Sequence, residues 1–471
     1  MGRRSFLFII FLVLFFSCNH NHTSEHTVQT SFRDLEGILE RGKLVAVTDY
    51  NPTNYFIYKG EPMGFNFELL NLFATHIGVD LEIRTENDIE SAIGMLNNGE
   101  ADLLAMSLPV NGDLNTPLRF TQAIHETRQV LIQRKPDKWR TMTADRVNAS
   151  LLRNHLELAD KVIYVPKGSF YSKRISHIQR EIGDTIYTVE LPYETEGLVS
   201  LVAKGEIDYT ICDESYARVA ATFYPNLDIN TPVSFSQKRS WAMRPLESEE
   251  LGVEFDNWFR MYRNSRAYAF LYAKYFKNPR TGTIYSSRYY ANSTGRISPW
   301  DEMIKSYSDS ISWDWRLLAA LIYQESRFDP YVTSHAGAYG LMQVMPSTGN
   351  HFGIDITSTP ENNIRAGMLY IRWLEKMFSD RIPDQEERIR FILASYNAGP
   401  GHVLDAMRLA NSEGIDSSTW YGSVESYILK KSDPRYYNHP EVQHGYFTGR
   451  ETVSFVTDIL KRYDHYRNII K

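Results

Sequence analysis

Cysteine is nearly absent from this chain of 471 residues, which contains only Cys18 and Cys212. Two thiols so far apart exclude a disulfide framework and a cysteine zinc site, because both need more thiols at closer spacing. An excess of positive charge is also lacking, since 51 Lys and Arg stand against 57 Asp and Glu, a net charge of −6. Domains that bind nucleic-acid backbones usually carry a basic excess, so we expect no nucleic-acid partner.

Long hydrophobic runs are lacking as well. The apolar run from Phe6 to Phe16 is too short to cross a bilayer as a helix, and no later stretch approaches the required length. The composition is that of a globular chain, with 43% hydrophobic, 23% charged and 13% aromatic residues. It excludes a disordered, collagenous or polytopic membrane protein, and the length predicts two to four domains.

The first residues indicate the compartment. A basic start, Gly2-Arg3-Arg4, precedes the apolar run, and Ser17 and Cys18 follow it. This is the anatomy of a secretory signal peptide, predicted here over residues 1–17. A small residue followed by cysteine at this point resembles the lipobox of bacterial lipoproteins, whose cysteine becomes the lipidated N-terminus. We therefore expect a lipid anchor at Cys18, and plain secretion with an incidental Cys18 is the alternative.

The segment after the anchor is polar. Residues 18–32 lack apolar runs, which is typical of a mobile tether. The tether contains His20, His22 and His26, for which solvation is favoured over metal binding. Asn19 stands where an aspartate is associated with inner-membrane retention in some bacteria, so we expect the outer membrane, facing the periplasm.

Strand-like and helical patterns alternate in the first half of the chain. The run LVAVTDY from Leu44 predicts a strand, and the spacing of Leu69, Leu70, Phe73 and Ala74 predicts a helix. The next unit repeats this order, with a helix stopped near residues 97–99 and a strand over residues 103–106. A second set comprises VIYVPKGSF, LVSLVAKGEIDYTICDESYA and the return segment SFSQKRSWAMRP. Such repeats predict a two-lobed α/β fold with a ligand cleft at the strand ends.

These segments resemble the family 3 bacterial extracellular solute-binding proteins. The resemblance is carried by Gly64-Phe65, by Leu96 with Gly99 and Asp102, and by GEID at residues 205–208. It implies a periplasmic-binding-protein-like domain, which we place at residues 33–276.

Two positions bear on the ligand of this domain. In that family a carboxylate matching Asp213 holds the amino group of the ligand, and a helix N-cap is the alternative for Asp213. An arginine usually clamps the ligand carboxylate with its bidentate guanidinium. Here Leu114 takes the place of that arginine, and Arg119 belongs to a later position. A peptide or muropeptide fragment, or no ligand, is therefore favoured over a free amino acid.

The second half of the chain is helical in its pattern. Residues 277–296 are rich in Gly, Ser, Asn and basic residues and predict a linker. In the following segment, one helix face carries Leu317, Leu318, Leu321, Ile322 and Glu325.

Glu325 is a candidate proton donor. Asp329-Pro330 ends the helix just after it, so Glu325 lies at the C-terminal end. Partial desolvation and the negative end of the helix dipole both predict a raised pKa for this carboxyl group. A carboxylic acid that stays protonated near neutral pH can donate its proton to a glycosidic oxygen. By itself, a glutamate at a helix end is more often an ordinary solvated residue.

The motifs around Glu325 strengthen this assignment. ESRFDP, SHAGAYGLMQVMPST, NIRAGMLYI and SYNAGPG, in this order, closely resemble the soluble lytic transglycosylase domain, a lysozyme-like α-helical fold of glycoside hydrolase family 23. The resemblance covers residues 297–471. It implies that Glu325 is the single catalytic acid and base and that the sugar subsites are lined by Ser334, Gln343, Met345, Tyr396 and Asn397. Glu451 matches an acidic residue of a late family motif, in which Phe455 replaces the family tyrosine.

No second carboxylate is evident for a hydrolase mechanism. Asp329 lies one helical turn after Glu325, but the proline that follows it favours a structural capping role. With one carboxylate, the 2-acetamido group of the substrate can stabilise the cationic centre. The resemblance thus implies cleavage of the MurNAc-GlcNAc β-1,4 bond to 1,6-anhydromuramoyl ends. We expect no metal and no organic cofactor, because the usual motifs for them are absent from the sequence.

The expected architecture is thus multidomain, a two-lobed α/β domain followed by an all-α lysozyme-like domain. The two resemblances together imply a peptidoglycan lytic transglycosylase with an N-terminal ligand-sensing or positioning domain. The alternative is a non-catalytic regulatory lipoprotein that binds glycan or muropeptide. Glu325 stands intact in its motif, which favours the enzyme. A transport receptor is disfavoured because such receptors need no C-terminal helical domain.

Overall fold

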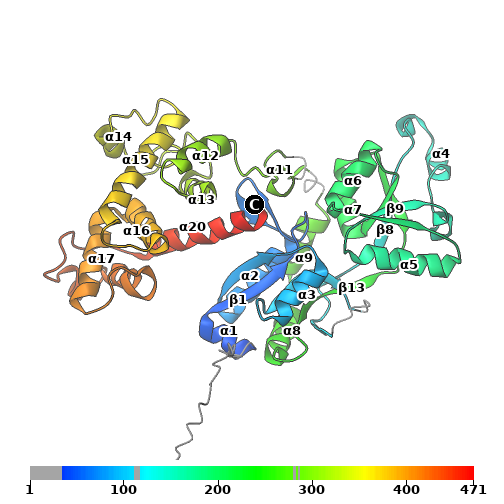
Figure 1. Ribbon diagram of the computed structural model, residues 1–471, viewed down its shortest axis with the longest axis horizontal. Coiled ribbons are helices and arrows are strands. Elements are labelled where there is room, and N and C mark those ends of the chain that lie inside the picture. The colour runs from blue at the N-terminus through cyan, green and yellow to red at the C-terminus, as the bar shows by residue number, and fades with distance from the viewer. Residues whose placement is uncertain (1–33, 111–116, 279–282, 285–286, 471) are drawn as a thin grey trace, which may run out of the picture.

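The computed structural model describes residues 34–110, 117–278, 283–284 and 287–470. Two α/β lobes and a helical domain are visible in it, with the first lobe between the other two (Figure 1). This arrangement confirms the predicted fold class. Cys18 and Leu114, for which the sequence makes predictions, lie outside the described residues.

The first lobe is a mostly parallel sheet covered by helices. The sheet order is β4-β1-β5-β13-β6, with β7 also paired to β13. Strand β1 runs parallel to β4 and β5, whereas β13 runs antiparallel to β5. The elements are α1 (Leu35–Arg41), β1 (Lys43–Thr48), β2 (Phe56–Tyr58), β3 (Glu61–Met63), α2 (Phe65–Ile77), β4 (Asp80–Thr85), α3 (Ile89–Asn97), β5 (Leu103–Pro109), β6 (Arg119–Phe120), β7 (His125–Thr127), β13 (Gln237–Met243), α8 (Glu249–Arg263) and α9 (Arg266–Phe276).

The second lobe has the sheet order β10-β9-β11-β8-β12. Its strands β9, β10 and β11 are parallel, and β8 is antiparallel to both β11 and β12. The elements are β8 (Gln129–Arg134), η1 (Trp139–Thr141), α4 (Ala144–Ala149), η2 (His155–Leu158), β9 (Val162–Pro166), α5 (Phe170–Ile182), β10 (Tyr187–Leu191), α6 (Thr195–Lys204), β11 (Tyr209–Asp213), α7 (Glu214–Phe223) and β12 (Leu227–Pro232).

The chain crosses between the lobes twice, from β7 to β8 and from β12 to β13. The predicted helix over Leu69 to Ala74 is α2, and all four of its predicted core residues are buried. The predicted return segment is β13, which completes the sheet of the first lobe. The sequence patterns for both lobes are therefore confirmed.

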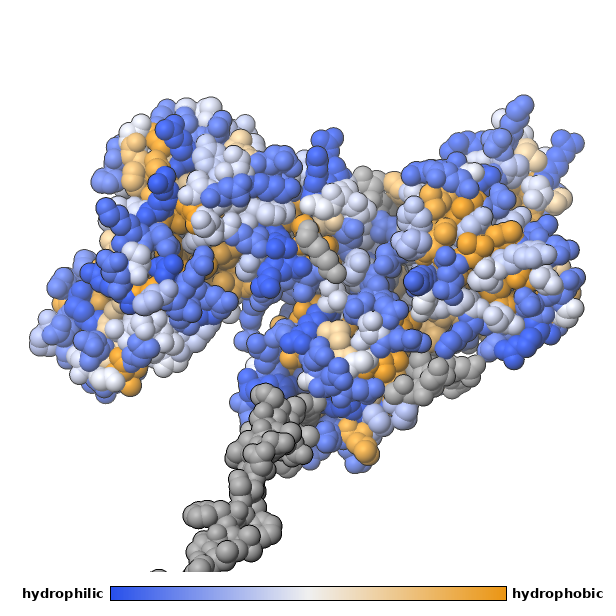
Figure 2. Space-filling view, viewed as in Figure 1, coloured by the Kyte–Doolittle hydropathy of each residue, from blue (hydrophilic) through white to orange (hydrophobic). Residues whose placement is uncertain are grey.

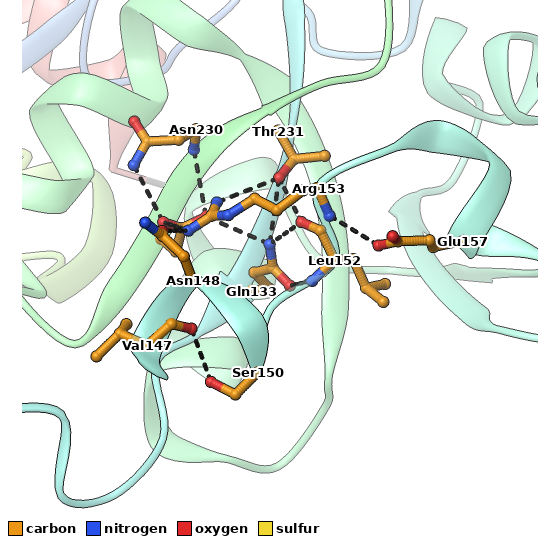
Figure 3. Close-up of polar contacts among 10 residues, drawn as sticks. Gln133, Val147, Asn148, Ser150, Leu152, Arg153, Glu157, Asn230 and Thr231 are labelled. Atoms are coloured by element: carbon orange, nitrogen blue, oxygen red, sulfur yellow. Dashed lines mark hydrogen bonds and ion pairs between the residues drawn. The ribbon is translucent and has the colours of Figure 1, made fainter. Parts of the chain in front are cut away.

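The segment around Leu152 and Arg153, between α4 and η2, is held against the sheet of the second lobe by polar contacts (Figure 3). Arg153 binds both carboxylate oxygens of Asp228, at 2.6 and 3.1 Å. The side chain of Gln133 in β8 donates to the carbonyl of Leu152 and accepts from its N–H. Thr231 donates to the same carbonyl at 2.6 Å. These contacts give hydrogen-bond partners to the buried side chains of Asp228 and Gln133. Without such partners, both groups would lose their hydration on burial with nothing to replace it.

The helical domain packs around α13 (Figure 1). Its elements are α11 (Ala291–Thr294), α12 (Asp301–Asp309), α13 (Trp315–Ser326), α14 (Pro346–His351), α15 (Pro360–Phe378), α16 (Gln385–Ala398), α17 (Pro400–Ser412), η3 (Trp420–Val424), α18 (Glu425–Lys430), α19 (Pro434–Tyr437) and α20 (Arg450–Ile469). Leu317, Leu318, Leu321 and Ile322 of α13 are buried, as their spacing predicts.

A hairpin of the first lobe enters the helical domain. Ile57 of β2 belongs to the core of the helical domain, and the hydroxyl of Tyr323 in α13 donates to Glu61 of β3. Tyr290, from the segment between the domains, is fully buried in the core of the first lobe. A side chain of the first lobe thus packs in the core of the helical domain, and a side chain of the connecting segment packs in the core of the first lobe.

Helix α20 reaches from the helical domain onto the first lobe (Figure 1). Near its C-terminus, Asn468 donates to the carbonyl of Ile83 at 2.7 Å and accepts from Thr85 at 2.9 Å. One turn earlier, Nδ1 of His465 lies 2.8 Å from the hydroxyl of Tyr55. The sequence analysis did not predict this contact between residues some 400 positions apart.

In the space-filling view the helical domain and the first lobe are mostly hydrophilic, and the second lobe, at the right, shows larger hydrophobic areas (Figure 2). No helix within the described residues is long and apolar enough to span a membrane.

Gly60, at the tip of the hairpin formed by β2 and β3, provides a test of the contact between the first lobe and the helical domain. Its φ is +81°, and a Cβ there would lie 2.6 Å from Tyr323 and 2.8 Å from the hydroxyl of Tyr466. Gly78 has a φ of +75° with no atom within 4 Å of the same position. We expect Gly78→Ala to cost roughly 1 kcal/mol from the backbone conformation. Gly60→Ala should cost about 1–3 kcal/mol more because of overpacking.

Urea unfolding of both variants measures this difference. Equal destabilisation by the two substitutions would show that the hairpin tip is not packed against α13 and α20.

Candidate active site

Helix α13 positions Glu325. Asp314 caps the helix, because its carboxylate accepts the N–H of Arg316 at 2.9 Å. The helix ends at Ser326, and Arg327 follows in the left-handed region with a φ of 51°. Glu325 therefore lies in the last turn, as predicted.

The side chain of Glu325 is partly buried at the end of α13. Burial raises the pKa of Glu325 from 4.5 to about 8. Among the described residues, no other carboxylate contributes to this shift and no cation pairs with Glu325. A glutamic acid of this pKa is mostly protonated at neutral pH, so it can serve as a general acid.

The loop that follows α13, residues 332–344, is held from two sides. Ser326 donates to the carbonyl of Leu341 at 2.8 Å. From α15, the buried side chain of Asn363 accepts the N–H of Met342 at 2.9 Å and donates to the carbonyl of Tyr339 at 2.7 Å. The loop backbone is thereby fixed beside the end of α13.

Gly340 explains part of the small-residue motif in this loop. Its φ is +78°, and a Cβ there would lie 2.6 Å from the side chain of Asn363. A larger residue would displace Asn363 and so release the loop. Gln343 has a φ of 45° and donates to the carbonyls of Val332 and Gly340, which closes the loop.

Tyr396 comes from the last turn of α16. Its hydroxyl donates to the carbonyl of Met342 at 2.8 Å. Burial raises the pKa of Tyr396, and the charge of Glu325 raises it further. Tyr396 therefore lies within electrostatic range of Glu325 and keeps its proton.

The next residue, Asn397, is exposed and accepts a hydrogen bond from Thr452 at 2.7 Å. Gly399 separates α16 from α17. Thr452 is fully buried in the first turn of α20. Thr452, which follows Glu451 in the late family motif, therefore orients the side chain of Asn397.

The remaining residues of the predicted site lie in the loop, at the start of α14 and in α20. Ser334 accepts the N–H of Ala338 at 3.0 Å within the loop, and Met345 is exposed at the start of α14. Glu451 is exposed in the first turn of α20. Phe455 is buried in the core of the helical domain, where a phenyl ring packs without needing a hydrogen-bond partner.

Asp329 has a local structural contact. Its carboxylate accepts the N–H of Tyr331 at 2.9 Å and so closes the turn after α13. This contact agrees with the structural role expected for it.

Three residues that hold the site were missed by sequence reasoning: Ser326, Asn363 and Thr452. Each lies inside or beside a motif that the sequence analysis used, namely ESRFDP, NIRAGMLYI and the late motif. Their burial was the missing signal, because a buried polar side chain must find a partner.

In the first domain, Asp213 lies at the N-cap position of α7 but makes no capping hydrogen bond. Its carboxylate accepts instead from Arg239 of β13 at 2.7 Å. Both residues line a cavity of about 1610 Å³ between the two lobes. Arg119 lies in β6, opposite Met243 of β13, and it does not line the cavity.

Two family models match the chain. Bacterial extracellular solute-binding proteins, family 3, matches residues 43–278, and Transglycosylase SLT domain matches residues 302–418. The class is therefore a solute-binding-type domain joined to a lytic transglycosylase domain.

A membrane-bound lytic murein transglycosylase F from Desulfosudis oleivorans is 31% identical to this chain and aligns over 92% of each. A relative of the same name from Vibrio cholerae is 30% identical and aligns over 91% of this chain and 80% of its own. The chain belongs to the membrane-bound lytic murein transglycosylase F family. A crystal structure of the P235GK mutant of ArgBP from T. maritima is 20% identical and covers 52% of this chain and 99% of its own, with a TM-score of 0.43.

The raised pKa of Glu325 predicts a pH-dependent effect on stability. In the unfolded chain Glu325 ionises near pH 4.5, and in the folded chain near pH 8. Between these values the unfolded state binds fewer protons, so the contribution of Glu325 to stability falls as pH rises. Glu325→Gln carries no such group, and its melting temperature relative to the parent should rise from pH 5 to pH 8.

Thermal unfolding at the two pH values measures this effect. Glu302→Gln, which removes an exposed carboxylate, is the control for loss of a charge. A pH-independent difference for Glu325→Gln would contradict the burial of Glu325.

Proposed function

We propose that Glu325 is the single acid and base of a peptidoglycan lytic transglycosylase. The observation that carries this proposal is the partly buried carboxyl group of Glu325, which pairs with no cation among the described residues and whose pKa desolvation raises to about 8. A retaining hydrolase would need a second carboxylate about 5–5.5 Å away. No carboxylate among the described residues influences Glu325, which favours the non-hydrolytic reaction.

The reaction uses Glu325 twice. The protonated carboxyl group first donates its proton to the glycosidic oxygen between MurNAc and GlcNAc, and the bond from C1 of MurNAc to that oxygen breaks. The 2-acetamido group of the substrate stabilises the cationic C1. The carboxylate of Glu325 then removes the proton of the muramoyl 6-hydroxyl as its oxygen bonds to C1. The products are a free GlcNAc hydroxyl and a 1,6-anhydromuramoyl end, and no water is consumed.

We propose that Ser334, Gln343, Met345, Tyr396, Asn397 and Glu451 line the sugar subsites. The support is their origin in the loop after α13, in the start of α14, in the end of α16 and in the start of α20. Asn397 and Glu451 are exposed, so both can meet a glycan strand.

Digestion of purified sacculi tests the reaction. The soluble chain lacking residues 1–18 should release anhydro-ended muropeptides, identified by mass analysis. Glu325→Gln should reduce the release at least about 100-fold, because general acid catalysis commonly contributes that much.

Reducing-ended products would instead indicate a hydrolase. Binding to sacculi without release by the parent protein would indicate the alternative function, a regulatory lipoprotein that grips glycan without cutting it.

We also propose that Cys18 carries a lipid anchor in the outer membrane. The support is the signal-like segment before Cys18 and the family to which the chain belongs. The parent chain should fractionate with outer membranes of a Gram-negative host, and Cys18→Ala should fractionate with soluble envelope proteins. Membrane association that survives Cys18→Ala would contradict the anchor.

Finally, we propose that the first domain binds a peptide or muropeptide fragment between its lobes. The support is the cavity between them, whose lining includes Asp213.

A further inference from the structure

Helix α15 carries two aromatic side chains beyond its contact with the loop over residues 332–344. Gly367 of this helix faces the loop, since a Cβ there would lie 2.5 Å from the sulfur of Met342. Tyr370 and Trp373 follow at intervals of three residues. Side chains three positions apart on a helix are neighbours, so Tyr370 and Trp373 continue the side of α15 that begins at the loop.

Three aromatic rings are in contact at this place. The ring centroids of Tyr396 and Tyr370 are 5.4 Å apart. Those of Tyr370 and Trp373 are 5.8 Å apart, with their planes at 15°. Tyr396 lies within electrostatic range of Glu325, whose charge raises the pKa of Tyr396. The ring contacts therefore lead from the surroundings of Glu325 through Tyr370 to Trp373.

Trp373 differs from the other tryptophans in its exposure. All eight tryptophans lie within the described residues, and Trp373 is the only exposed one, at 41%. An indole is large and mostly apolar, so it is usually covered by a core or by a binding partner. Tyr370 covers only part of the Trp373 ring. An open indole that continues from a candidate active site favours a ligand that covers the rest.

A second observation concerns the hydroxyl group of Tyr370. Burial raises the pKa of Tyr370 to about 12, and neither a charge nor a hydrogen bond contributes to this shift. Within the described ranges this hydroxyl has no hydrogen-bond partner, whereas the hydroxyl of Tyr396 is occupied by the carbonyl of Met342 at 2.8 Å. Tyr370 thus keeps its proton near neutral pH and can donate a hydrogen bond to a ligand.

An open aromatic face beside a free hydroxyl fits a sugar ring. One face of a pyranose carries C–H groups, which pack against an aromatic ring. The hydroxyl and acetamido groups at its rim need hydrogen-bond partners once they leave water. Trp373 offers the apolar face and Tyr370 the donor. Neither side chain is charged near neutral pH, which suits the uncharged sugars of a glycan.

We infer that Tyr370 and Trp373 form a further sugar subsite for the glycan strand, adjacent to Tyr396. A pyranose ring packs on the open part of the Trp373 indole, and the hydroxyl of Tyr370 donates to an oxygen of that sugar. The subsite extends the path of the strand along α15. The inference rests on the proposed function and adds a binding contact that takes no part in the proton transfers of Glu325.

Titration with chitohexaose, an uncharged β-1,4-linked oligomer of N-acetylglucosamine, tests the subsite. The protein is the soluble chain lacking residues 1–18 and carries Glu325→Gln throughout, so that no bond is cleaved during the measurement. Calorimetry gives the affinity, and tryptophan fluorescence reports the surroundings of the indoles. We expect saturable binding and a change in the emission, because the sugar covers the one exposed tryptophan.

Substitutions in this protein locate the contact. Trp373→Ala should weaken binding by about 5-fold or more, from the loss of the aromatic face. Trp373→Phe keeps such a face and should bind within about 3-fold, but without the change in emission. Tyr370→Phe removes only the hydroxyl and should weaken binding about 3-fold or more.

Arg372→Ala is the matched control. It removes a large exposed side chain at the position before Trp373 and should leave the affinity within about 2-fold. Unchanged melting temperatures show that the variants fold.

Three results would overturn the inference. They are the absence of saturable chitohexaose binding by the chain with Glu325→Gln alone, equal affinities after Trp373→Ala and Arg372→Ala, and an emission change that persists in Trp373→Phe. Reducing-ended products from sacculi would contradict the reaction proposed for Glu325 and would leave this binding result unchanged.

Discussion

The partly buried carboxyl group of Glu325 is the feature around which the candidate active site of the helical domain is arranged. Glu325 lies in the last turn of α13, most of which is buried, and it has no cation partner among the described residues. The loop over residues 332–344 and the end of α16 lie beside it and are fixed by Ser326, Asn363 and Tyr396. Each of these three residues makes its hydrogen bond to the loop backbone and not to the carboxyl group of Glu325.

The same helix connects the active site to the first lobe. Tyr323, two residues before Glu325, donates to Glu61 of the hairpin, and the guanidinium of Arg462 lies 3.8 Å from the ring of Tyr323. Gly60 at the hairpin tip accepts from Arg462 and Tyr466 of α20. The catalytic domain therefore uses the first lobe as part of its own support, and α20 belongs to both.

Some carboxylates of the cavity in the first domain are paired with a cation of the chain, and others are not. Asp213, the residue expected to hold an amino group, is paired with Arg239 from the opposite lobe. Within the described part of the chain, the cavity carboxylates Asp49, Glu194 and Glu196 make no ion pair. The chemistry of the cavity thus depends on which carboxylates the protein pairs with its own cations.

Much of this protein could be predicted from the sequence alone. Helical spacing, the Asp329-Pro330 stop and the order of four motifs correctly predicted α13, the position of Glu325 at its end and the direction of its pKa shift. These features depend on neighbouring residues, and local propensity and periodicity are properties of short segments. Only the tertiary structure decided the partner of Asp213, the burial of Asn363 and Thr452, and the contact of Tyr55 with His465. Those pairings join residues far apart in the chain, so they follow from how the elements pack and not from any local pattern.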